Sequence, residues 1–358
     1  MSVDVMNPNS DREITEDEAK LYDRQIRLWG VNSQKMLRKA NVLCVGCSGL
    51  SSEVIKNIVL AGINSLTVMD DAKISEKDSF SNIFTRVKIG LNRAEVSVEN
   101  IKTLNPMVMV KALDWNIKEK LETPDENFVN LLKNCNVVFI SNYDPDTMMK
   151  LNDLCHSIEN VNINFFAACD WGFYGFSFTD LGRKYNYISE EVTQKEIYTE
   201  GPAEKKLKNE QPEKAYVQKY LDFVPLRQAL AVKSGKAGIG ITKRTSSVLI
   251  LVHVLFKFYQ AKGRYPEAEH RSEDIELLNR LKDEVADDLA YSKSSLKDLE
   301  EDQFFDNVYG ELSPVSAIIG GALGQDIIRS ITHQDAPIRN FFLFNGLRLS
   351  GTVESIGK

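Results

Sequence analysis

The sequence predicts an α/β protein in which a mostly parallel sheet carries helices on its faces and a helical insertion interrupts the later part of the chain. Three observations support this fold class. A strand, a glycine turn, a helix and a second strand follow one another between Asn41 and Asp70. Two short segments, the apolar run 137–140 and Asn164 to Ala168 with its four apolar residues, are typical of strands buried on both faces. Apolar residues recur at helical spacing between positions 248 and 289.

The first of these stretches has the pattern of a βαβ unit that binds a nucleotide. Residues 42–45 are apolar at every position, as in a parallel strand covered on both faces. Gly46 and Gly49 form a tight turn without a Cβ to block a phosphate, and the N-terminus of the next helix points at that turn. Asp70 ends the second strand, about 20 residues later, where a ribose-binding acid is expected. The stretch is therefore predicted to be a Rossmann-type unit.

The glycine pattern of this unit is incomplete. A full G-x-G-x-x-G would place glycine at positions 48 and 51, where the chain has Ser48 and Ser51. The loop therefore either binds a nucleotide or belongs to a βαβ unit that no longer holds one, and its residues leave both alternatives open.

Size and composition restrict the class of protein. The 358 residues suffice for a large core, with 43% hydrophobic and 27% charged residues, as in soluble globular proteins. A net charge of −7 argues against nucleic acid as a partner, because phosphate contacts need a basic surface. The longest apolar run, residues 248–256, is too short to span a membrane, and the polar N-terminus predicts no signal peptide.

Five cysteines without a regular framework indicate free thiols in a reducing compartment. Cys44 and Cys47 have C-x-x-C spacing, but Cys44 belongs to the strand, whereas a reactive first cysteine should be exposed at a helix N-terminus. Cys135, Cys155 and Cys169 do not supply the second pair that a structural zinc site needs. We therefore expect buried, inert cysteines and no metal site.

Composition divides the chain into a main body and an insertion. Lysine, glutamate, asparagine and glutamine dominate between Arg183 and Tyr220, which predicts a mobile linker. The predicted segments are a disordered N-terminus (1–14), the first part of the α/β body (15–182), the charged linker (183–222), a helical insertion (223–310), the return to the body (311–350) and a tail (351–358).

The C-terminal part of the body is predicted to contain a helix starting at Ser313 and a closing strand at 341–344. Gly320, Gly321 and Gly324 lie within this helix and weaken it by about 1 kcal/mol each relative to alanine. Such glycines are expected where another backbone comes very close, either at a packed helix crossing or at a subunit interface.

At the other end of the chain, a capping box at Thr15 and Glu18 starts a helix that Gly30 is expected to end. The string YDRQIRLWG at residues 22–30 lies on this helix. Four further motifs follow it: GLNRAE at 90–95, LNP at 104–106, SPVSAIIGG at 313–321 and NFFLFNG at 340–346.

Together these motifs resemble those of the enzymes that activate ubiquitin-like proteins, over residues 15–180 and 310–350. Length and motif order are similar to the small, regulatory, non-cysteine subunits of the heterodimeric members that activate SUMO. The corresponding subunit for NEDD8 is a considerably longer chain. The resemblance implies a Rossmann-like adenylation half-domain of the type shared by ubiquitin-activating and sulfur-carrier-activating enzymes.

The resemblance also implies a reaction. The carboxylate of the ubiquitin-like protein attacks the α-phosphate of Mg-ATP and pyrophosphate leaves. A catalytic cysteine then captures the acyl adenylate as a thioester, and AMP leaves. In the heterodimers only one half holds ATP, and this chain resembles the other half. The active half carries an asparagine and an arginine–glutamine pair where this chain has Ser79, Asn82 and Ile83. Arg93 replaces its lysine, a point charge that a planar guanidinium does not reproduce, and Ala72 replaces its second acid.

Two acids of the active half remain in this chain. Asp70 and Asp144 are interpreted as inherited scaffold, with Asp144 capping a nearby helix rather than binding magnesium. The vestigial loop of Gly46, Gly49 and Asp70 is therefore expected to hold no cofactor.

What the chain is expected to contribute is Arg24, which in the family reaches across the dimer onto ATP bound by the partner. Such an arginine finger in trans is a permanently charged, bidentate donor. Arg27 is a weaker candidate for the same role. Cys169 follows a strand and is not expected to be the thioester cysteine.

The partners that the resemblance implies are the large catalytic subunit, SUMO and, indirectly, the SUMO-conjugating enzyme, with Mg-ATP bound by the large subunit. The implied location is the nucleus, with a cytoplasmic pool. Two alternatives remain: an autonomous homodimeric adenylating enzyme for a ubiquitin-like or sulfur-carrier protein, and an NAD-binding oxidoreductase. The second needs an intact glycine loop and a proton-transfer residue, and neither is visible.

Overall fold

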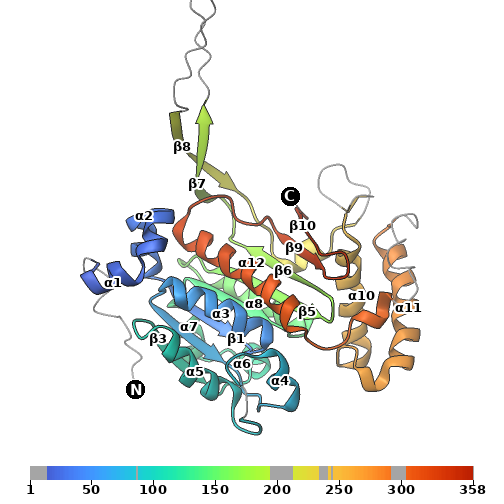
Figure 1. The fold of residues 1–358 in the computed structure, drawn as a ribbon. Helices are drawn as coiled ribbons and strands as arrows, with labels where there is room; N and C mark the ends of the chain where they lie inside the picture. Colours follow the sequence, from blue (N-terminus) through green and yellow to red (C-terminus); the bar gives the residue numbers. More distant parts are fainter. Residues whose placement is uncertain are drawn as a thin grey trace, which may run out of the picture.

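The computed structural model describes residues 14–85, 88–193, 213–233, 241–242, 245–291 and 304–357. Their main feature is an eight-stranded sheet (Figure 1). In spatial order its strands are β10 (Ser350–Glu354), β9 (Phe341–Asn345), β6 (Tyr174–Asp180), β5 (Asn164–Trp171), β4 (Val137–Ser141), β1 (Asn41–Val45), β2 (Ser65–Met69) and β3 (Met109–Leu113). Strands β3, β2, β1, β4 and β5 are parallel, and β6, β9 and β10 are antiparallel. This sheet confirms the predicted Rossmann-like α/β fold class.

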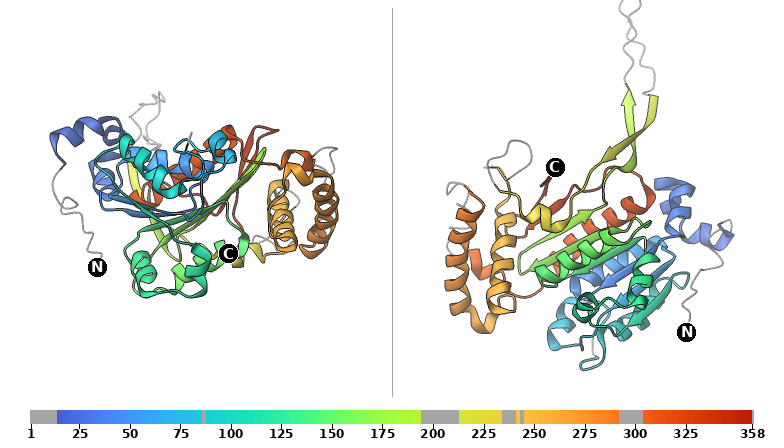
Figure 2. Two further views of the ribbon diagram at one scale, coloured as in Figure 1. Left: turned by 90° about the horizontal axis from the view of Figure 1, so that it is seen from below. Right: turned by 180° about the vertical axis from the view of Figure 1, so that it is seen from behind.

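Helices cover both faces of the sheet (Figure 2). Val42 and Cys44 of β1 pack on one side and Leu43 and Val45 on the other, which explains why the strand is apolar throughout. One layer contains α2 (Asp23–Leu37), α3 (Gly49–Ala61), α5 (Arg93–Leu104) and α12 (Ser313–Thr332). The other contains α6 (Ile117–Glu122), α7 (Glu126–Lys133), α8 (Pro145–Ser157) and α9 (Leu226–Leu230).

The glycines of α12 make a close crossing with α3, side by side with it in Figure 1. A Cβ on Gly320 would lie 2.7 Å from Glu53 Cβ, and one on Gly324 would lie 2.9 Å from Asn57 Cβ. The predicted close approach is therefore a helix crossing at these two positions. Gly321 differs, because a Cβ there would meet nothing within 4 Å.

The N-terminal region forms two helices, α1 (Glu16–Leu21) and α2, rather than one. The capping box of Thr15 and Glu18 is confirmed. Gly30, with φ 85° and ψ 161°, breaks the helical geometry inside α2 but does not end it, because the helix resumes and continues to Leu37. The predicted end at Gly30 is thus a kink, in a conformation that glycine adopts without strain. Residues 1–13, predicted to be disordered, lie outside the described residues.

The segment predicted as a mobile linker contains two antiparallel strands, β7 (Tyr185–Thr193) and β8 (Glu213–Leu221), which project from the body in Figure 1. Tyr185 and Tyr187 anchor the base of this ribbon, because both are buried against the body. The linker prediction is wrong for these residues, because the two strands pair from Tyr185–Leu221 to Thr193–Glu213 despite the charged composition. Residues 194–212 lie outside the described part of the chain.

Helices beside the sheet occupy the described parts of the predicted insertion (Figure 1). Apart from α9 they are α10 (Ser247–Lys262), η1 (Ala268–His270), α11 (Arg271–Asp288) and η4 (Phe304–Asn307). Most residues of α10 are apolar and buried, and the helix packs through Phe256 on Trp171 of β5. The predicted tail at 351–358 is wrong in part, because β10 pairs with β9 and belongs to the sheet.

Among the described helices, none combines the length and apolar character needed to cross a membrane. The same part of the chain contains no group of three or more histidine, cysteine, aspartate or glutamate side chains arranged to hold a metal ion.

Candidate functional site

The loop between β1 and α3 lies at the carboxyl ends of the parallel strands, beside the point where β1 neighbours both β2 and β4. In open α/β sheets, ligands bind at such a switch point. Ser48 accepts a hydrogen bond from the Ser51 N–H at 3.2 Å and so caps α3. The Ser51 hydroxyl donates to the Gly46 carbonyl oxygen at 2.6 Å. The serines that interrupt the glycine pattern thus hold the loop in place.

Gly46 makes room for a protein side chain. A Cβ at this position would lie 2.5 Å from Cε2 of Tyr143 and 3.0 Å from the carbonyl oxygen of Ser141. Tyr143 follows β4 and lies against the loop from the side of the neighbouring strand. The expectation that Gly46 leaves space for a phosphate is therefore corrected, because the tyrosine ring fills that space.

The N-terminus of α3 meets a carboxylate from the far end of the chain. The Gly49 N–H donates to Oε2 of Glu311 at 3.2 Å, and the Ser81 hydroxyl donates to the same oxygen at 2.6 Å. Asn142, after β4, donates to the other oxygen of Glu311. A helix N-terminus attracts anions through its free N–H groups and its dipole. Here the chain's own glutamate takes the position in which a phosphate would be bound.

Asp70, predicted as the ribose acid, is fully buried and bonded within the protein. Its Oδ2 accepts from the Cys47 N–H at 2.6 Å and from Arg93 Nε at 2.7 Å, and its Oδ1 accepts from the Ala72 N–H at 2.9 Å. Arg93 also donates to Asp78 of α4 (Glu76–Ser81) at 2.9 Å. Burial acts to lower the pKa of the Arg93 guanidinium, but the charge of Asp70 and the hydrogen bond to it outweigh this effect and raise that pKa. Internal partners therefore neutralise this carboxylate.

Asp144 caps α8. Its Oδ1 accepts from the Thr147 N–H at 2.9 Å, and its Oδ2 pairs with Lys118 Nζ at 2.9 Å. Burial acts to raise the pKa of the Asp144 carboxyl, but the Thr147 and Lys118 donors outweigh it and lower that pKa. The capping role interpreted from the sequence is confirmed.

A second buried carboxylate connects to Glu311. Asp170, at the end of β5, accepts from Asn142 Nδ2 at 2.8 Å and from the Ser316 hydroxyl of α12. Burial first, and then the nearby charge of Glu311, raises the pKa of Asp170 to about 7. This network joins the start of α12 to the carboxyl ends of the strands.

Replacing Asp170 by asparagine should make the stability of the chain less dependent on pH. A carboxyl whose pKa rises from 3.8 to about 7 on folding stabilises the folded state most below pH 4 and loses that contribution as pH rises to 7. As pH rises from 5 to 8, the free energy of unfolding of the variant should therefore increase by about 1–3 kcal/mol relative to that of wild type, as measured by urea unfolding. Asp283→Asn, on the exposed face of α11, is the control and should leave the profile unchanged. If the stability of Asp170→Asn and that of wild type changed with pH in the same way, the raised pKa of Asp170 would be contradicted.

The predicted arginines lie at the opposite end of α3 from this loop. Arg24 is in the first turn of α2, is exposed, and makes no ion pair within the part of the chain that the structure describes. Arg27 pairs with Asp23 one turn away, with Nη2 3.1 Å from Oδ2. Its neighbour Gln25 donates to the carbonyl of Leu60 at 3.2 Å, which places this turn beside the C-terminus of α3. The structure therefore separates Arg24 and Arg27 from Gly46, Gly49 and Asp70.

All five cysteines are buried and unpaired, in agreement with the sequence analysis. Burial raises the pKa of the Cys47 thiol to about 11, and that of Cys169 lies well above its ordinary value for the same reason. A thiol with a raised pKa in an apolar site is a poor nucleophile.

Four residues of the site that contact its predicted residues or one another were not found from the sequence: Glu311, Tyr143, Lys118 and Asp170. Each acts on a group far away in the chain, and Glu311 is 262 positions from Gly49. Tyr143 offered one signal, because it directly follows a predicted parallel strand, where site residues gather. Glu311 offered none, since it lies outside any motif.

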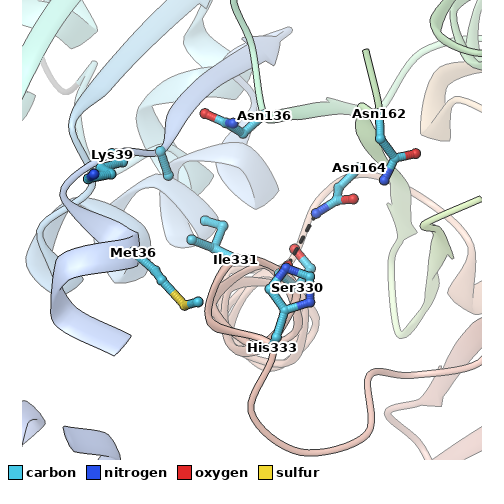
Figure 3. A pocket seen from close by; sticks show the side chains of 9 residues that line it. Met36, Lys39, Asn136, Asn162, Asn164, Ser330, Ile331 and His333 are labelled. Atoms are coloured by element: carbon cyan, nitrogen blue, oxygen red, sulfur yellow. Dashed lines mark hydrogen bonds between the residues drawn. The ribbon is translucent and has the colours of Figure 1, made fainter. Parts of the chain in front are cut away.

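A groove of about 310 Å³ lies at the other edge of the sheet, near the amino ends of β1, β4 and β5 (Figure 3). Asparagines 136, 162 and 164 line it, together with His333 and Met36. Asn164 Nδ2 donates to the Ser330 carbonyl oxygen at 3.3 Å, as the dashed line in Figure 3 marks. None of the residues predicted for the site lines this groove.

The sheet order and the loop at its switch point define a Rossmann-like α/β protein. Comparisons with known proteins agree with this class. The chain belongs to the ThiF family, whose model matches residues 22–356. Over 349 residues it is 37% identical to SUMO-activating enzyme subunit 1 of Rattus norvegicus, with 96% of each chain covered. The same protein from Xenopus laevis is 38% identical over 350 residues (96% of this chain, 97% of the relative). The Homo sapiens protein is 36% identical over 349 residues, with 96% of each covered.

These relatives correct the identification made from the sequence, which described a small, regulatory, non-cysteine subunit. The proteins that match are named subunit 1 of the SUMO-activating enzyme, and their names contain no reference to a regulatory role. The designation as subunit 1 therefore replaces the description as regulatory, whereas a small, non-cysteine subunit is consistent with these relatives.

Proposed function

We propose that this chain is the partner subunit of a heterodimeric SUMO-activating enzyme. It pairs with a large subunit that binds Mg-ATP and carries the catalytic cysteine, and it supports adenylation of the SUMO C-terminus and formation of the thioester. The shared name of the relatives and their coverage of nearly the whole chain support this role.

The observation that carries the proposal is the filling of the nucleotide loop by the chain's own side chains. Glu311 accepts the Gly49 N–H of α3, Arg93 binds Asp70, and Tyr143 lies against Gly46. A bound nucleotide would have to displace a carboxylate from the helix N-terminus and a guanidinium from a buried aspartate. These residues do not fit Mg-ATP, so we assign its binding to the partner.

Pairing with another protein is supported by apolar side chains exposed on one layer of the fold. Ile318 of α12, Phe80 of α4 and Leu28 of α2 are 43%, 80% and 78% exposed. Beside Ile318, the uncrowded Gly321 gives α12 a smooth outer surface. Large exposed apolar side chains on several helices of one layer are typical of a protein interface.

The position of Arg24 supports a role in trans. Helix α3 has 13 residues and is therefore about 20 Å long. The loop is at one end of this helix and Arg24 is beside the other, so the guanidinium does not reach the loop of its own chain. An exposed guanidinium without an ion pair to the described residues suits the phosphates of a nucleotide held by another subunit.

The remaining parts of the proposal follow from this assignment. Contact with SUMO and, indirectly, with the SUMO-conjugating enzyme takes place in the assembled heterodimer, in the nucleus and in a cytoplasmic pool.

The proposal is tested by ATP–pyrophosphate exchange with SUMO present. The purified chain alone should show only background exchange, and adding the large subunit of a SUMO-activating enzyme should restore it. Exchange by the chain alone at the rate of the mixture would instead identify a self-sufficient homodimeric adenylating enzyme.

A further inference from the structure

The C-terminal end of α3 is held by three side-chain amides from other parts of the chain. The carbonyl oxygens of residues 59, 60 and 61 accept from Asn105 Nδ2 at 2.8 Å, Gln25 Nε2 at 3.2 Å and Gln34 Nε2 at 2.9 Å, respectively. The last carbonyls of a helix have no partner of their own in the helix. The amides satisfy these groups and fix α2 to the end of α3.

The two glutamines lie on opposite sides of the kink in α2. Gln25 belongs to the first half, together with Arg24, and Gln34 belongs to the second half. At Gly30 the backbone has φ 85° and ψ 161°, which breaks the regular hydrogen bonding between the halves. Each half is therefore fixed to α3 by its own glutamine.

A second contact fixes the first half just before Arg24. Tyr22 is 2% exposed, and its hydroxyl oxygen accepts from Asn105 Nδ2 at 2.8 Å. The tyrosine ring lies against the end of α3, where a Cβ on Gly62 would be 2.6 Å from its hydroxyl oxygen. Tyr22 and Gln25 thus anchor the chain two residues before Arg24 and one residue after it.

We propose that Gln25 and Tyr22 are positioning residues for Arg24, and that they set the place from which its guanidinium reaches the nucleotide of the partner subunit. The inference rests on the proposed function, because the role of Arg24 in trans is part of it. A long, exposed side chain aims a charge accurately only if its backbone is fixed, and errors of about 1 Å at a reacting centre lower rates by up to about 100-fold. Both anchors act on the backbone beside Arg24 and leave its side chain free.

The experiment uses the assembled heterodimer and the rate of ATP–pyrophosphate exchange. Gln25→Met removes the amide donor at similar volume and should lower the rate about three- to tenfold. Tyr22→Phe removes a single oxygen atom and should also lower the rate of exchange. Gln34→Met is the matched control, because it removes the same type of bond on the other side of the kink and should change the rate by less than about twofold.

A double-mutant cycle with Arg24→Ala distinguishes positioning from a general structural role. In the Arg24→Ala background, Gln25→Met and Tyr22→Phe should cause no further loss, because the group that they position is absent. Equal losses in both backgrounds, or a loss for Gln34→Met as large as for Gln25→Met, would overturn the inference. If Gln25→Met does not assemble, the Tyr22→Phe cycle decides by the same criterion. A wild-type rate for Arg24→Ala alone would instead reject the part of the proposed function that concerns Arg24.

Discussion

Replacing Arg24 by alanine is expected to slow adenylate formation by the heterodimer about 100- to 1000-fold. The guanidinium carries a permanent charge and two parallel donors, which suit the charge that develops on the departing pyrophosphate. Because Arg24 is exposed and has no ion pair within the described residues, its loss should leave the fold of the chain intact. The measurement is ATP–pyrophosphate exchange at saturating SUMO, with assembly checked by size-exclusion chromatography.

Arg27→Ala is the natural control for this prediction. Arg27 lies three positions further along α2, and its guanidinium already pairs with Asp23 at 3.1 Å. Removal of an exposed pair within one helix changes stability by only about 0.3–0.5 kcal/mol. We therefore expect a change in rate of less than about threefold. Equal rates for Arg24→Ala and wild type would contradict a role in trans, and a large loss with Arg27→Ala would move that role to Arg27.

The sequence predicted the βαβ unit well because its signals are local. Residues 42–45 are apolar in a row, and this is where the strand is buried on both faces. Asp144 precedes a proline at the start of α8, so its capping role could also be predicted from neighbours along the chain. Both signals come from residues that contact each other within a few positions.

The filling of the loop could not be predicted in the same way. Gly46 and Gly49 were expected to leave room for a ligand, and a glycine pattern does not say whether a ligand or another side chain uses that room. Glu311 lies just before α12, which crosses α3 closely at Gly320 and Gly324, and it reaches Gly49 from the far end of the chain. The identity of that partner is a property of the tertiary structure.

The ribbon of β7 and β8 shows the opposite kind of error. Its charged composition favoured a linker, yet Tyr185 and Tyr187 are buried at alternate positions of β7. Tyr185 stacks on His333 at the end of α12, with ring centroids 5.1 Å apart. The spacing of these two tyrosines was the only local signal for a strand, because the same alternation continues with the polar residues Ser189 and Glu191.

Replacing Arg93 by methionine is expected to destabilise the chain by about 3–5 kcal/mol, the range observed when one partner of a buried ion pair is removed. Asp70 has no exposed surface, and Arg93 is its only cationic partner among the described residues, with a side chain 19% exposed. Methionine fills a similar volume but leaves the carboxylate with two backbone donors, from Cys47 and Ala72. The measurement is the free energy of unfolding of the isolated chain in urea.

Two further variants separate the charge from the geometry of this pair. Arg93→Lys keeps the charge but loses the planar fork that joins Asp70 to Asp78. Its free energy of unfolding should therefore lie between those of wild type and Arg93→Met. Arg280→Met, which removes an exposed pair with Glu284, should cost less than about 1 kcal/mol. If Arg93→Met lowers the free energy of unfolding no more than Arg280→Met does, then Arg93 does not stabilise the buried Asp70. The contact of Arg93 would then no longer support the proposal that the chain's own side chains fill the nucleotide loop. If Arg93→Met is as harmful as expected, the acid that would bind ribose in an intact nucleotide site is an internal part of the fold in this chain.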